Sequence, residues 1–414
     1  MPKSAVVHSA SNPPAGAPGE EPLGPAQPAG PGPSPWIVVA GGGTVGHVSP
    51  GVAIAEALVR RGCPRQRIHF VGSRRGVEAT RVPGAGFSLT LLPGRGIQRR
   101  LTAENIGAVT GLGAAFVAAF ALLVRHRPRV VLSLGGYASV PCGVAAALLR
   151  IPIVVAEQNA IPGAANRLVG RAARACAVSF EGTDLPHAVL TGNPVRPEVL
   201  AVDRRADRDA ARARLGIDAG RTLILAYGGS LGARTVNRAV WSALDTLADR
   251  SDLAVRHVIG DRGWQERPPG GRGEGPATDG AGAGVGLVYQ AVRYEEDMPS
   301  ALCAADVVLS RAGASTVFEL AAVGVGSILV PLPIATEDHQ TANARVLEQA
   351  GAAVVVPDAE FDGARLVAEL DGLLAAPGRL EAMAANARTV GRPDAAERVA
   401  DLLVRHARRP WEAS

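Results

Sequence analysis

The amino-acid sequence predicts an α/β protein made of two doubly wound halves, each built around a parallel β-sheet. The first observation is that short apolar runs bounded by turn residues alternate with longer segments of helical pattern, which is typical of βαβ units. The second is that this alternation stops at the proline-bracketed segment 192–200 and then begins again. The third is the length of 414 residues, which suits about two domains.

The apolar runs define the elements that we expect. The predicted strands of the first half are 36–40, 68–71, 88–92, 130–134, 153–156 and 175–178, and those of the second half are 222–226, 254–259, 286–289, 307–309, 327–330 and 353–355. The predicted domains are therefore an N-terminal domain at 36–191, a linker at 192–200 and a C-terminal domain at 201–390, with a last helix in 391–414 that packs back on the N-terminal domain.

Two segments do not fit the α/β pattern. Residues 1–35 contain ten prolines and five glycines and almost no large apolar side chains, so they cannot offset the entropy of ordering and are predicted to be a disordered tail. Residues 268–286 are rich in glycine and proline and interrupt the second half, which predicts a flexible surface insertion.

Composition excludes several classes of protein. Lys3 is the only lysine, so arginine replaces lysine throughout the sequence and its abundance alone says little about function. The net charge is only +5, which does not indicate nucleic-acid binding. The four cysteines are far apart and form no C-x-x-C pair, so neither a disulfide scaffold nor a zinc site is expected. The N-terminus lacks the apolar region of a signal peptide, so no signal peptide is predicted. The apolar run 106–124 contains three glycines, which favours a helix packed on a sheet over a membrane span.

Four predicted strands end in glycine-rich turns that open helices, and these turns are the main functional signal. They lie at 40–47, 135–137, 228–232 and 310–316. Glycine lets backbone N–H groups approach an anion, and the following helix N-terminus adds partial positive charge. One such turn has an ordinary structural explanation, whereas four of them, two in each half, predict a phosphate-bearing ligand between the domains.

The first turn has the G-x-G-x-x-G spacing of a dinucleotide site at Gly41, Gly43 and Gly46. A dinucleotide site also needs an acidic residue at the end of the second strand, where this sequence has Gly72 and Ser73. The sequence contains no G-K-[ST] of a P-loop either, so nicotinamide chemistry and P-loop chemistry are both disfavoured.

Seven motifs in order resemble the MurG family of peptidoglycan N-acetylglucosaminyltransferases. They are GGTVGHVSP at 42–50, GGYAS at 135–139, EQNAIPG at 157–163, GNPVR at 192–196, GGSLGA at 228–233, SRAGASTVFE at 310–319 and DHQTANA at 338–344. The resemblance covers about residues 36–407. The resemblance implies the GT-B architecture, in which two Rossmann-like domains face a cleft, and an inverting transfer of N-acetylglucosamine from UDP-N-acetylglucosamine to lipid I.

The resemblance also implies donor-binding residues in both halves. Ser230 and Arg196 are expected at the donor diphosphate, together with the backbone of Ala314, Ser315 and Thr316. Glu319 resembles the carboxylate that binds the ribose hydroxyls, and Gln340 and Asn343 resemble residues that hold the sugar. From the other domain, Asn159 and the residues Thr44, Val45 and Gly46 are expected to reach the donor.

On the acceptor side, the resemblance implies that the turns of the first half bind the acceptor diphosphate. The residues concerned are Gly42, Gly43, Gly135, Gly136, Tyr137 and Glu157. His47 is the candidate catalytic residue, because an imidazole titrates near neutral pH and can take the proton of the acceptor hydroxyl. For His47 a role in positioning the acceptor stays open, and Glu157 is an alternative base or a buried hydrogen-bonding residue.

No cofactor or metal is expected. The only D-x-D motif, formed by Asp207 and Asp209, lies in a charged helical run away from any strand end, and a helix N-terminus with Arg196 can stabilise the leaving UDP. The expected partners are UDP-N-acetylglucosamine, lipid I and an anionic membrane surface at the cytoplasmic face of the cell membrane, with residues 94–101 as a basic and apolar contact loop.

Two departures from the family pattern leave alternatives open. Val45 stands where glycine or alanine is usual, and Ala156 replaces a histidine that commonly precedes the Glu-Gln-Asn motif. Both departures lie in the N-terminal half, which the resemblance assigns mainly to the acceptor. The alternatives are a UDP-N-acetylglucosamine 2-epimerase, a related transferase with another acceptor, and a catalytically silent protein that binds a nucleotide sugar.

Overall fold

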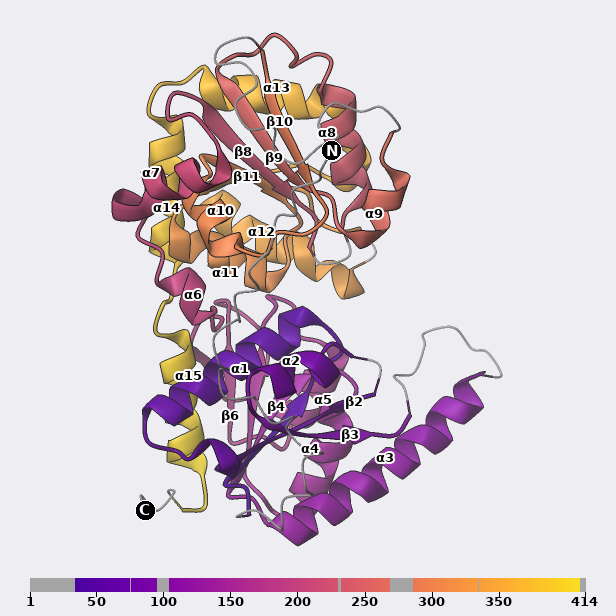
Figure 1. The fold of residues 1–414 in the computed structure, drawn as a ribbon. Coiled ribbons are helices and arrows are strands. Elements are labelled where there is room, and N and C mark those ends of the chain that lie inside the picture. Colours follow the sequence, from indigo (N-terminus) through magenta and orange to yellow (C-terminus); the bar gives the residue numbers. More distant parts are fainter. Residues whose placement is uncertain are drawn as a thin grey trace, which may run out of the picture. The chain divides into compact units, whose positions relative to one another are not determined.

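The computed structural model describes residues 34–74, 76–94, 104–229, 232–268, 286–333 and 335–409 (Figure 1). The predicted tail and the predicted insertion lie almost wholly outside the described residues, as do Ser230 and most of the predicted membrane-contact loop.

The first half contains a seven-stranded parallel sheet of order β3-β2-β1-β4-β5-β6-β7 (Figure 1). Its strands are β1 (Ile37–Gly41), β2 (Ile68–Ser73), β3 (Ser88–Leu92), β4 (Val130–Gly135), β5 (Ile153–Glu157), β6 (Ala175–Val178) and β7 (Ala188–Leu190). Its helices are α1 (Val45–Arg60), α2 (Glu78–Gly84), α3 (Glu104–His126), α4 (Ser139–Leu148) and α5 (Ala164–Gly170), with a 3₁₀ turn at Arg65–Arg67.

The second half contains a six-stranded parallel sheet of order β10-β9-β8-β11-β12-β13. Its strands are β8 (Thr222–Tyr227), β9 (Leu253–Val258), β10 (Val288–Val292), β11 (Val307–Ser310), β12 (Gly326–Leu329) and β13 (Ala353–Val355). The helices from the linker onward are α6 (Pro197–Leu200), α7 (Arg204–Leu215), α8 (Arg234–Ala243), α9 (Asp261–Glu266), α10 (Met298–Ala304), α11 (Ala314–Val323), α12 (His339–Gln349), α13 (Gly363–Leu374), α14 (Arg379–Val390) and α15 (Ala395–His406), with 3₁₀ turns at Thr336–Asp338 and Asp358–Glu360.

The predicted fold class is confirmed, and the sequence missed only one strand of the described part. Strand β7 is three residues long, lies at a sheet edge and is largely exposed, so it lacks the apolar run that marks the other strands. Strand β10 begins two residues later than predicted and extends to Val292, because Gln290 interrupts its apolar pattern.

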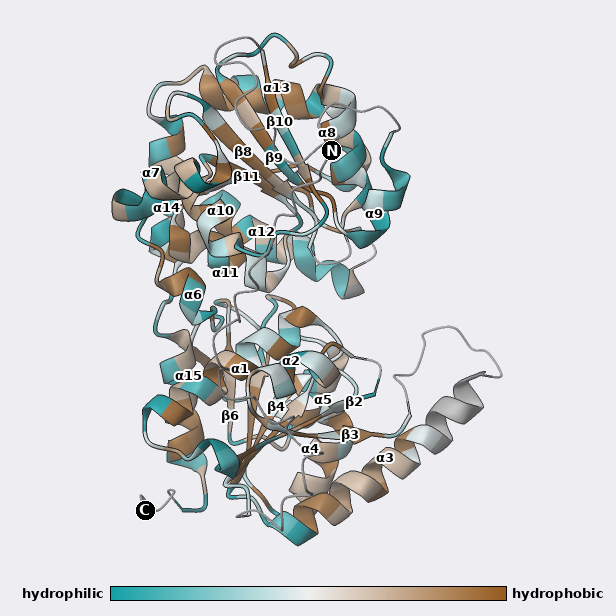
Figure 2. Ribbon diagram, in the orientation of Figure 1, coloured by the Kyte–Doolittle hydropathy of each residue, from teal (hydrophilic) through white to brown (hydrophobic). Residues whose placement is uncertain are grey.

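Both faces of each sheet are covered by helices, which explains why the strands are apolar throughout. In β1, Val38 packs into one hydrophobic cluster and its neighbour Val39 into the cluster on the opposite face. Figure 2 shows the same pattern in the second half, where the central strands are hydrophobic along their length. Parallel sheets that are buried on both faces have this composition.

The last helix, α15, returns to the first half and completes its core. Val399 and Leu403 are fully buried in the cluster that contains α1 and β1. On the surface, Arg61, which follows the last residue of α1, donates to Glu397 at 2.8 Å and to Asp401. The chain thus crosses between the two sheets twice, once through 192–200 and once through the segment before α15.

The strand order of each sheet reverses once, and the glycine turns lie at these reversals. The chain winds in opposite directions from β1 and β4 in the first sheet and from β8 and β11 in the second. The four glycine-rich turns follow these four strands. In open parallel sheets, ligands bind at the carboxyl ends of the strands where the order reverses, so the topology supports the prediction that the turns are functional.

No helix of the described ranges combines the length and the apolar character that a membrane span requires.

Candidate active site

The first glycine turn connects β1 to α1 through residues with positive φ angles. Gly42 has a φ of +142° and Gly43 a φ of +95°, values that side-chain-bearing residues rarely adopt. The Gly42 N–H donates to the Gly135 carbonyl at 3.3 Å, and a Cβ atom on Gly136 would overlap the Gly42 carbonyl oxygen. The turns after β1 and β4 therefore pack against each other, backbone to backbone.

A buried carboxylate lies under the first turn, and the sequence did not reveal it. Glu78, at the start of α2, is 1% exposed, and its Oε2 accepts a hydrogen bond of 2.8 Å from the Gly43 N–H. Its Oε1 accepts bonds of 2.7 and 2.9 Å from the N–H and hydroxyl of Ser73. The N–H groups of Gly42 and Gly43, predicted to bind an anion, are thus committed within the protein.

His47 lies in the first turn of α1, beside both glycine turns. Its Nδ1 atom is 2.8 Å from the Thr44 hydroxyl, and its Nε2 edge lies against Gly135. Burial lowers the pKa of His47 below the usual 6.5. The charges of Glu157 and Glu78 act in the opposite direction, whereas nearby His339 lowers the pKa further. A neutral imidazole at pH 7 with one nitrogen held by Thr44 is suited to accept a proton.

The second glycine turn is held by hydroxyl groups. The Ser139 hydroxyl lies 2.7 Å from the Gly135 carbonyl and 2.9 Å from the Ala40 carbonyl. The Tyr137 phenol donates toward the carbonyls of Pro93 at 2.8 Å and Gly111 at 3.2 Å, so it joins the turn to the end of β3 and to α3. In this structure the Tyr137 hydroxyl is therefore engaged, and its contact with an acceptor stays a prediction.

Glu157 ends β5 and organises the loop that follows. It is 3% exposed, and its two oxygens accept hydrogen bonds from the N–H groups of Asn159 at 2.9 Å and Gly163 at 3.1 Å and from the Asn166 amide at 2.9 Å. This geometry favours the buried hydrogen-bonding role over that of a base. Both carboxylate oxygens of Glu157 are therefore already hydrogen-bonded within the protein, and its contact with the acceptor stays a prediction.

Asn343 and Gln340 on α12 bind backbone groups around the fourth turn. Asn343 is fully buried; its Oδ1 accepts from the Ala160 N–H at 2.9 Å, and its amide donates to the Ala312 carbonyl at 3.2 Å. Gln340 Oε1 accepts from the N–H groups of Ala312 at 3.2 Å and Leu332 at 3.0 Å. Asn343 thus bonds to loops of both halves of the chain.

The fourth turn opens α11, which carries the other predicted donor residues. Gly313 caps the helix with extended backbone, and Ala314, Ser315 and Thr316 form the first turn, where the N–H groups of a helix have no partner within the helix. Ser315 has a buried hydroxyl without a hydrogen-bond partner among the described residues.

Glu319, one turn further along α11, pairs with Arg196 of the linker. The Arg196 Nε and Nη2 atoms each lie 3.0 Å from Glu319 Oε1. The Glu319 side chain is 13% exposed, and burial raises its pKa although Arg196 acts against this shift.

Tyr227, at the end of β8, has a buried hydroxyl with no hydrogen-bond partner in the described part of the chain. Burial and the charge of Glu319 raise the pKa of this phenol.

The third turn follows β8 and requires glycine at its end. Gly232 has a φ of +78°, and a Cβ atom there would overlap the Ile259 carbonyl oxygen. The predicted diphosphate ligand Ser230 lies outside the described residues. Its assignment therefore rests on the motif.

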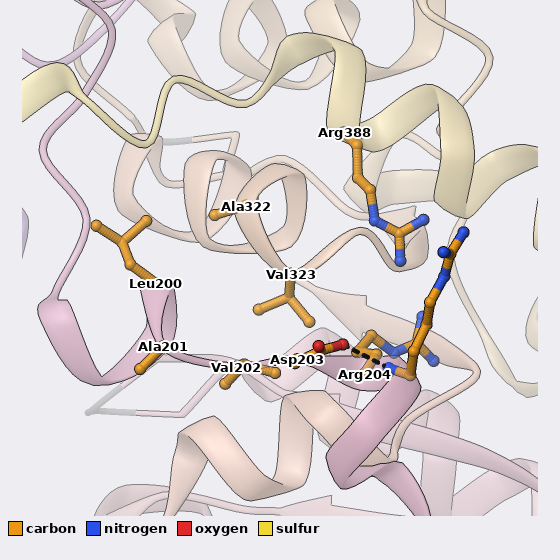
Figure 3. A pocket seen from close by; sticks show the side chains of 9 residues that line it. Leu200, Ala201, Val202, Asp203, Arg204, Ala322, Val323 and Arg388 are labelled. Atoms are coloured by element: carbon orange, nitrogen blue, oxygen red, sulfur yellow. Dashed lines mark hydrogen bonds between the residues drawn. The ribbon is translucent and has the colours of Figure 1, made fainter.

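Pockets lie on both sides of the linker. One of about 480 Å³ is lined by α1 from Val48 to Arg60 and by Arg196 and Glu198, so the helix that carries His47 and the linker arginine share a cavity. Another, of about 430 Å³, lies between α6, α7, α11 and α14 (Figure 3). It is lined by Arg204, whose guanidinium is committed to the carbonyls of Cys303, Ala305 and Gly324. This second pocket contains none of the predicted ligand-binding residues.

Within the described residues, no cluster of three or more His, Cys, Asp and Glu side chains has the geometry of a metal site. Asp207 and Asp209 of the D-x-D motif lie exposed on α7.

The sequence matches two family profiles that together cover most of the chain. They are the glycosyltransferase family 28 N-terminal domain, over residues 37–178, and the glycosyltransferase family 28 C-terminal domain, over residues 223–399. The predicted linker at 192–200 lies in the gap between the two matched ranges.

Individual relatives agree with the profiles. A protein of Alkalilimnicola ehrlichii is 43% identical over 375 residues, which are 90% of this chain and 99% of that protein. It is named UDP-N-acetylglucosamine–N-acetylmuramyl-(pentapeptide) pyrophosphoryl-undecaprenol N-acetylglucosamine transferase. The crystal structure of Acinetobacter baumannii MurG matches with a TM-score of 0.67 at 29% identity, over 89% of this chain and 98% of that one.

A solved structure from the rival class is similar in fold. A UDP-N-acetylglucosamine 2-epimerase of Listeria monocytogenes, described as putative, matches with a TM-score of 0.59 over 90% of this chain and 96% of that one. At 15% identity this likeness shows a shared fold alone.

Proposed function

This chain belongs to the MurG family within glycosyltransferase family 28, and from that membership we propose that it transfers N-acetylglucosamine from UDP-N-acetylglucosamine to lipid I. The acceptor is the C4 hydroxyl of the N-acetylmuramyl residue, which is attached to undecaprenyl diphosphate, and the product is lipid II of peptidoglycan synthesis. The observation that carries this proposal in the structure is the placement of all four glycine turns at the two strand-order reversals, with His47 at one reversal and Glu319 at the other.

The second half binds the donor in this proposal. Glu319 accepts hydrogen bonds from the ribose hydroxyls, and the N–H groups at the start of α11, with Ser230 and Arg196, hold the diphosphate. Gln340 and Asn343 hold the sugar hydroxyls, and Asn159 and the Thr44–Gly46 segment approach from the first half. The unpaired helix N–H groups and the guanidinium supply positive charge where the leaving diphosphate develops negative charge.

The reaction is a single displacement with inversion. His47 takes the proton of the acceptor hydroxyl as its oxygen bonds to the anomeric carbon, and the bond from that carbon to the UDP oxygen breaks. The products are the glycosylated lipid, UDP and a proton carried by His47, which later passes to solvent. Since Arg196 and the N-terminus of α11 stabilise the leaving group, we propose that the transfer needs no metal.

We further propose that the enzyme works as a peripheral protein on the anionic cytoplasmic face of the cell membrane. The neighbouring helices α3 and α4 expose apolar side chains that are spaced along one face of each helix: Val117, Val124, Val144 and Leu148, between 39% and 66% exposed. Exposed arginines at positions 125, 127 and 150 lie next to them in the sequence. Apolar side chains flanked by basic ones suit a surface of anionic headgroups. Figure 2 shows the apolar character of these two helices.

An assay with radiolabelled UDP-N-acetylglucosamine, with and without lipid I in detergent, tests the activity. We expect label in the lipid fraction only when lipid I is present. Release of UDP without acceptor would indicate an epimerase. Binding of UDP-N-acetylglucosamine without turnover would indicate a silent protein, and transfer to a different lipid would place the chain among transferases with another acceptor.

A further inference from the structure

Glu78 is a buried acid that forms its hydrogen bonds with neutral donors. Three groups donate to its carboxylate: the N–H of Gly43, the N–H of Ser73 and the hydroxyl of Ser73, at 2.7 to 2.9 Å. A carboxylate that is 1% exposed loses its hydration, which is costly unless the charge is compensated. The described residues place no guanidinium within ion-pair distance of it.

The surrounding backbone leaves room for this carboxylate through three glycines. A Cβ atom on Gly42 would lie 2.6 Å from the Glu78 Cδ atom, and Cβ atoms on Gly72 and Gly76 would also overlap the Glu78 side chain. These glycines belong to the turn after β1, to β2 and to the segment before α2. Three backbone positions are therefore shaped around one acidic group, and one of them, Gly42, is distant from Glu78 in the sequence.

The turn that Glu78 holds is the one that presents the candidate base. Gly43 is followed by Thr44, whose backbone caps α1 and whose hydroxyl lies 2.8 Å from His47 Nδ1. The titratable groups whose charges act on His47 are Glu78 from α2, Glu157 from β5 and His339 from α12. The two carboxylates favour the protonated imidazole, whereas His339 disfavours it.

We propose that Glu78 is a positioning residue of the transfer reaction, which fixes the Gly42–Thr44 turn under His47 and stabilises the imidazolium that forms when His47 takes the acceptor proton. This inference rests on the proposed function, in which His47 is the base. In the step concerned, the neutral ring carries its proton on Nδ1, which donates to the Thr44 hydroxyl, and Nε2 takes the proton of the acceptor hydroxyl. The negative charge of Glu78 makes His47 a stronger base without contact with either substrate.

Replacement of Glu78 by glutamine tests the charge. The amide is nearly isosteric, but it carries no negative charge and offers one acceptor oxygen instead of two. We expect kcat to fall about tenfold or more, while KM for UDP-N-acetylglucosamine changes less than kcat, because most of the proposed donor contacts lie in the second half of the chain. The acid limb of the pH profile should move to lower pH, since removal of the negative charge lowers the pKa of His47.

Two further variants separate charge from folding. In Glu78→Asp the charge remains but the shorter side chain cannot reach both Gly43 and Ser73, so kcat should fall while the acid limb stays near its wild-type position. Glu181→Gln, at an exposed acid of the same half, should change neither quantity. Ring-nitrogen NMR shifts of histidine-labelled protein, with the His47 signal assigned from His47→Asn, report the His47 pKa independently of turnover.

The outcomes distinguish this inference from the proposed function. If the wild-type protein does not transfer the sugar to lipid I, the proposed function fails. If the wild type is active and Glu78→Gln leaves kcat, the acid limb and the His47 titration unchanged, the role of Glu78 is wrong. If Glu78→Gln does not fold, Glu78→Asp decides: an unchanged kcat in that variant overturns the positioning role.

Discussion

The side-chain amide of Asn343, on α12, donates a hydrogen bond of 3.2 Å to the Oδ1 atom of Asn159, in the loop after β5. The two residues lie in different halves of the chain, and we propose that both bind the donor sugar. Without ligand, each satisfies part of the other's hydrogen-bonding capacity. In this proposal the sugar hydroxyls compete with this hydrogen bond for the same amide groups.

We predict that Asn343→Ala weakens both donor binding and the fold. The substitution leaves the Ala160 N–H and the Ala312 carbonyl without their partner, which should lower the free energy of unfolding by about 1–3 kcal/mol and raise KM for UDP-N-acetylglucosamine about tenfold. Steady-state kinetics and urea unfolding measure the two effects. The matched variant Asn386→Ala, on α14 with a single bond to the Gly351 carbonyl, should leave KM unchanged. An unaltered KM in Asn343→Ala would remove Asn343 from the donor site.

We predict that Glu319→Gln weakens UDP binding about 10- to 100-fold, because hydrogen bonds to a charged group contribute about 1.5–3 kcal/mol. The amide keeps the shape of the side chain but loses the charge that orders Arg196, which lies 3.0 Å away. Isothermal titration calorimetry with UDP measures the effect. Glu381→Gln, at an exposed glutamate of α14, serves as the control. Equal affinity of both variants for UDP would show that Glu319 does not bind the ribose.

The low pKa of His47 predicts the pH dependence of the reaction. Burial lowers the pKa of His47 and favours the neutral imidazole, so kcat/KM should fall on the acid side with a limb at lower pH than that of an ordinary imidazole. His47→Asn should lower kcat by about 10²- to 10⁴-fold, the usual contribution of general base catalysis. The exposed His187, replaced by Asn, is the control. An acid limb that persists in active His47→Asn protein would assign the titration to another group.

His257 predicts a loss of stability at low pH. It is fully buried; its Nε2 atom is 3.0 Å from Asn237 Oδ1 and its Nδ1 atom 3.0 Å from the Tyr289 hydroxyl, so the ring is neutral, with the proton on Nε2. Burial lowers the pKa of His257 to about 3. Between about pH 6.5 and pH 3 the unfolded chain therefore binds a proton that the native protein does not, and stability falls as the pH falls, by about 1.4 kcal/mol per pH unit for one site.

Urea unfolding at pH 7, 6 and 5 tests this linkage. His257→Gln should be less stable at every pH, but its free energy of unfolding should fall less steeply as the pH falls. Below pH 6 the two slopes should differ by about 1.4 kcal/mol per pH unit, the contribution of one titrating site. His187→Asn, at an exposed position, should keep the wild-type slope. Equal slopes for wild type and His257→Gln would contradict the buried, neutral state of His257.

The sequence predicted the features that depend on backbone conformation. A glycine at a strand end leaves a visible sign when the chain must turn with a positive φ, as at Gly43 and Gly232, or when two backbones touch, as at Gly136. The strands were equally visible, because sheets covered on both faces need continuous apolar runs. These two signals mark all four turns in the sequence.

The sequence did not predict contacts between side chains that are distant along the chain. Glu78 looks like an ordinary acid in the first turn of a helix, a position that the helix dipole favours, and only the fold brings it under Gly43, 35 positions away. Asn343 and Asn159 were each predicted to contact the sugar, but their bond to each other depends on how the two halves meet. The edge strand β7 was not predicted, because it is short and exposed.

The most direct test of the proposed reaction is an NMR measurement on the lipid product. The purified protein is incubated with UDP-N-acetylglucosamine labelled with carbon-13 at the anomeric carbon, together with lipid I, and the extracted lipid is examined. We predict one new labelled anomeric carbon with a β linkage to C4 of the muramyl residue, since a single displacement inverts the α linkage of the donor. An α-linked product, or label that remains in the sugar nucleotide while UDP-N-acetylglucosamine and lipid I are both present, would contradict an inverting transfer to lipid I.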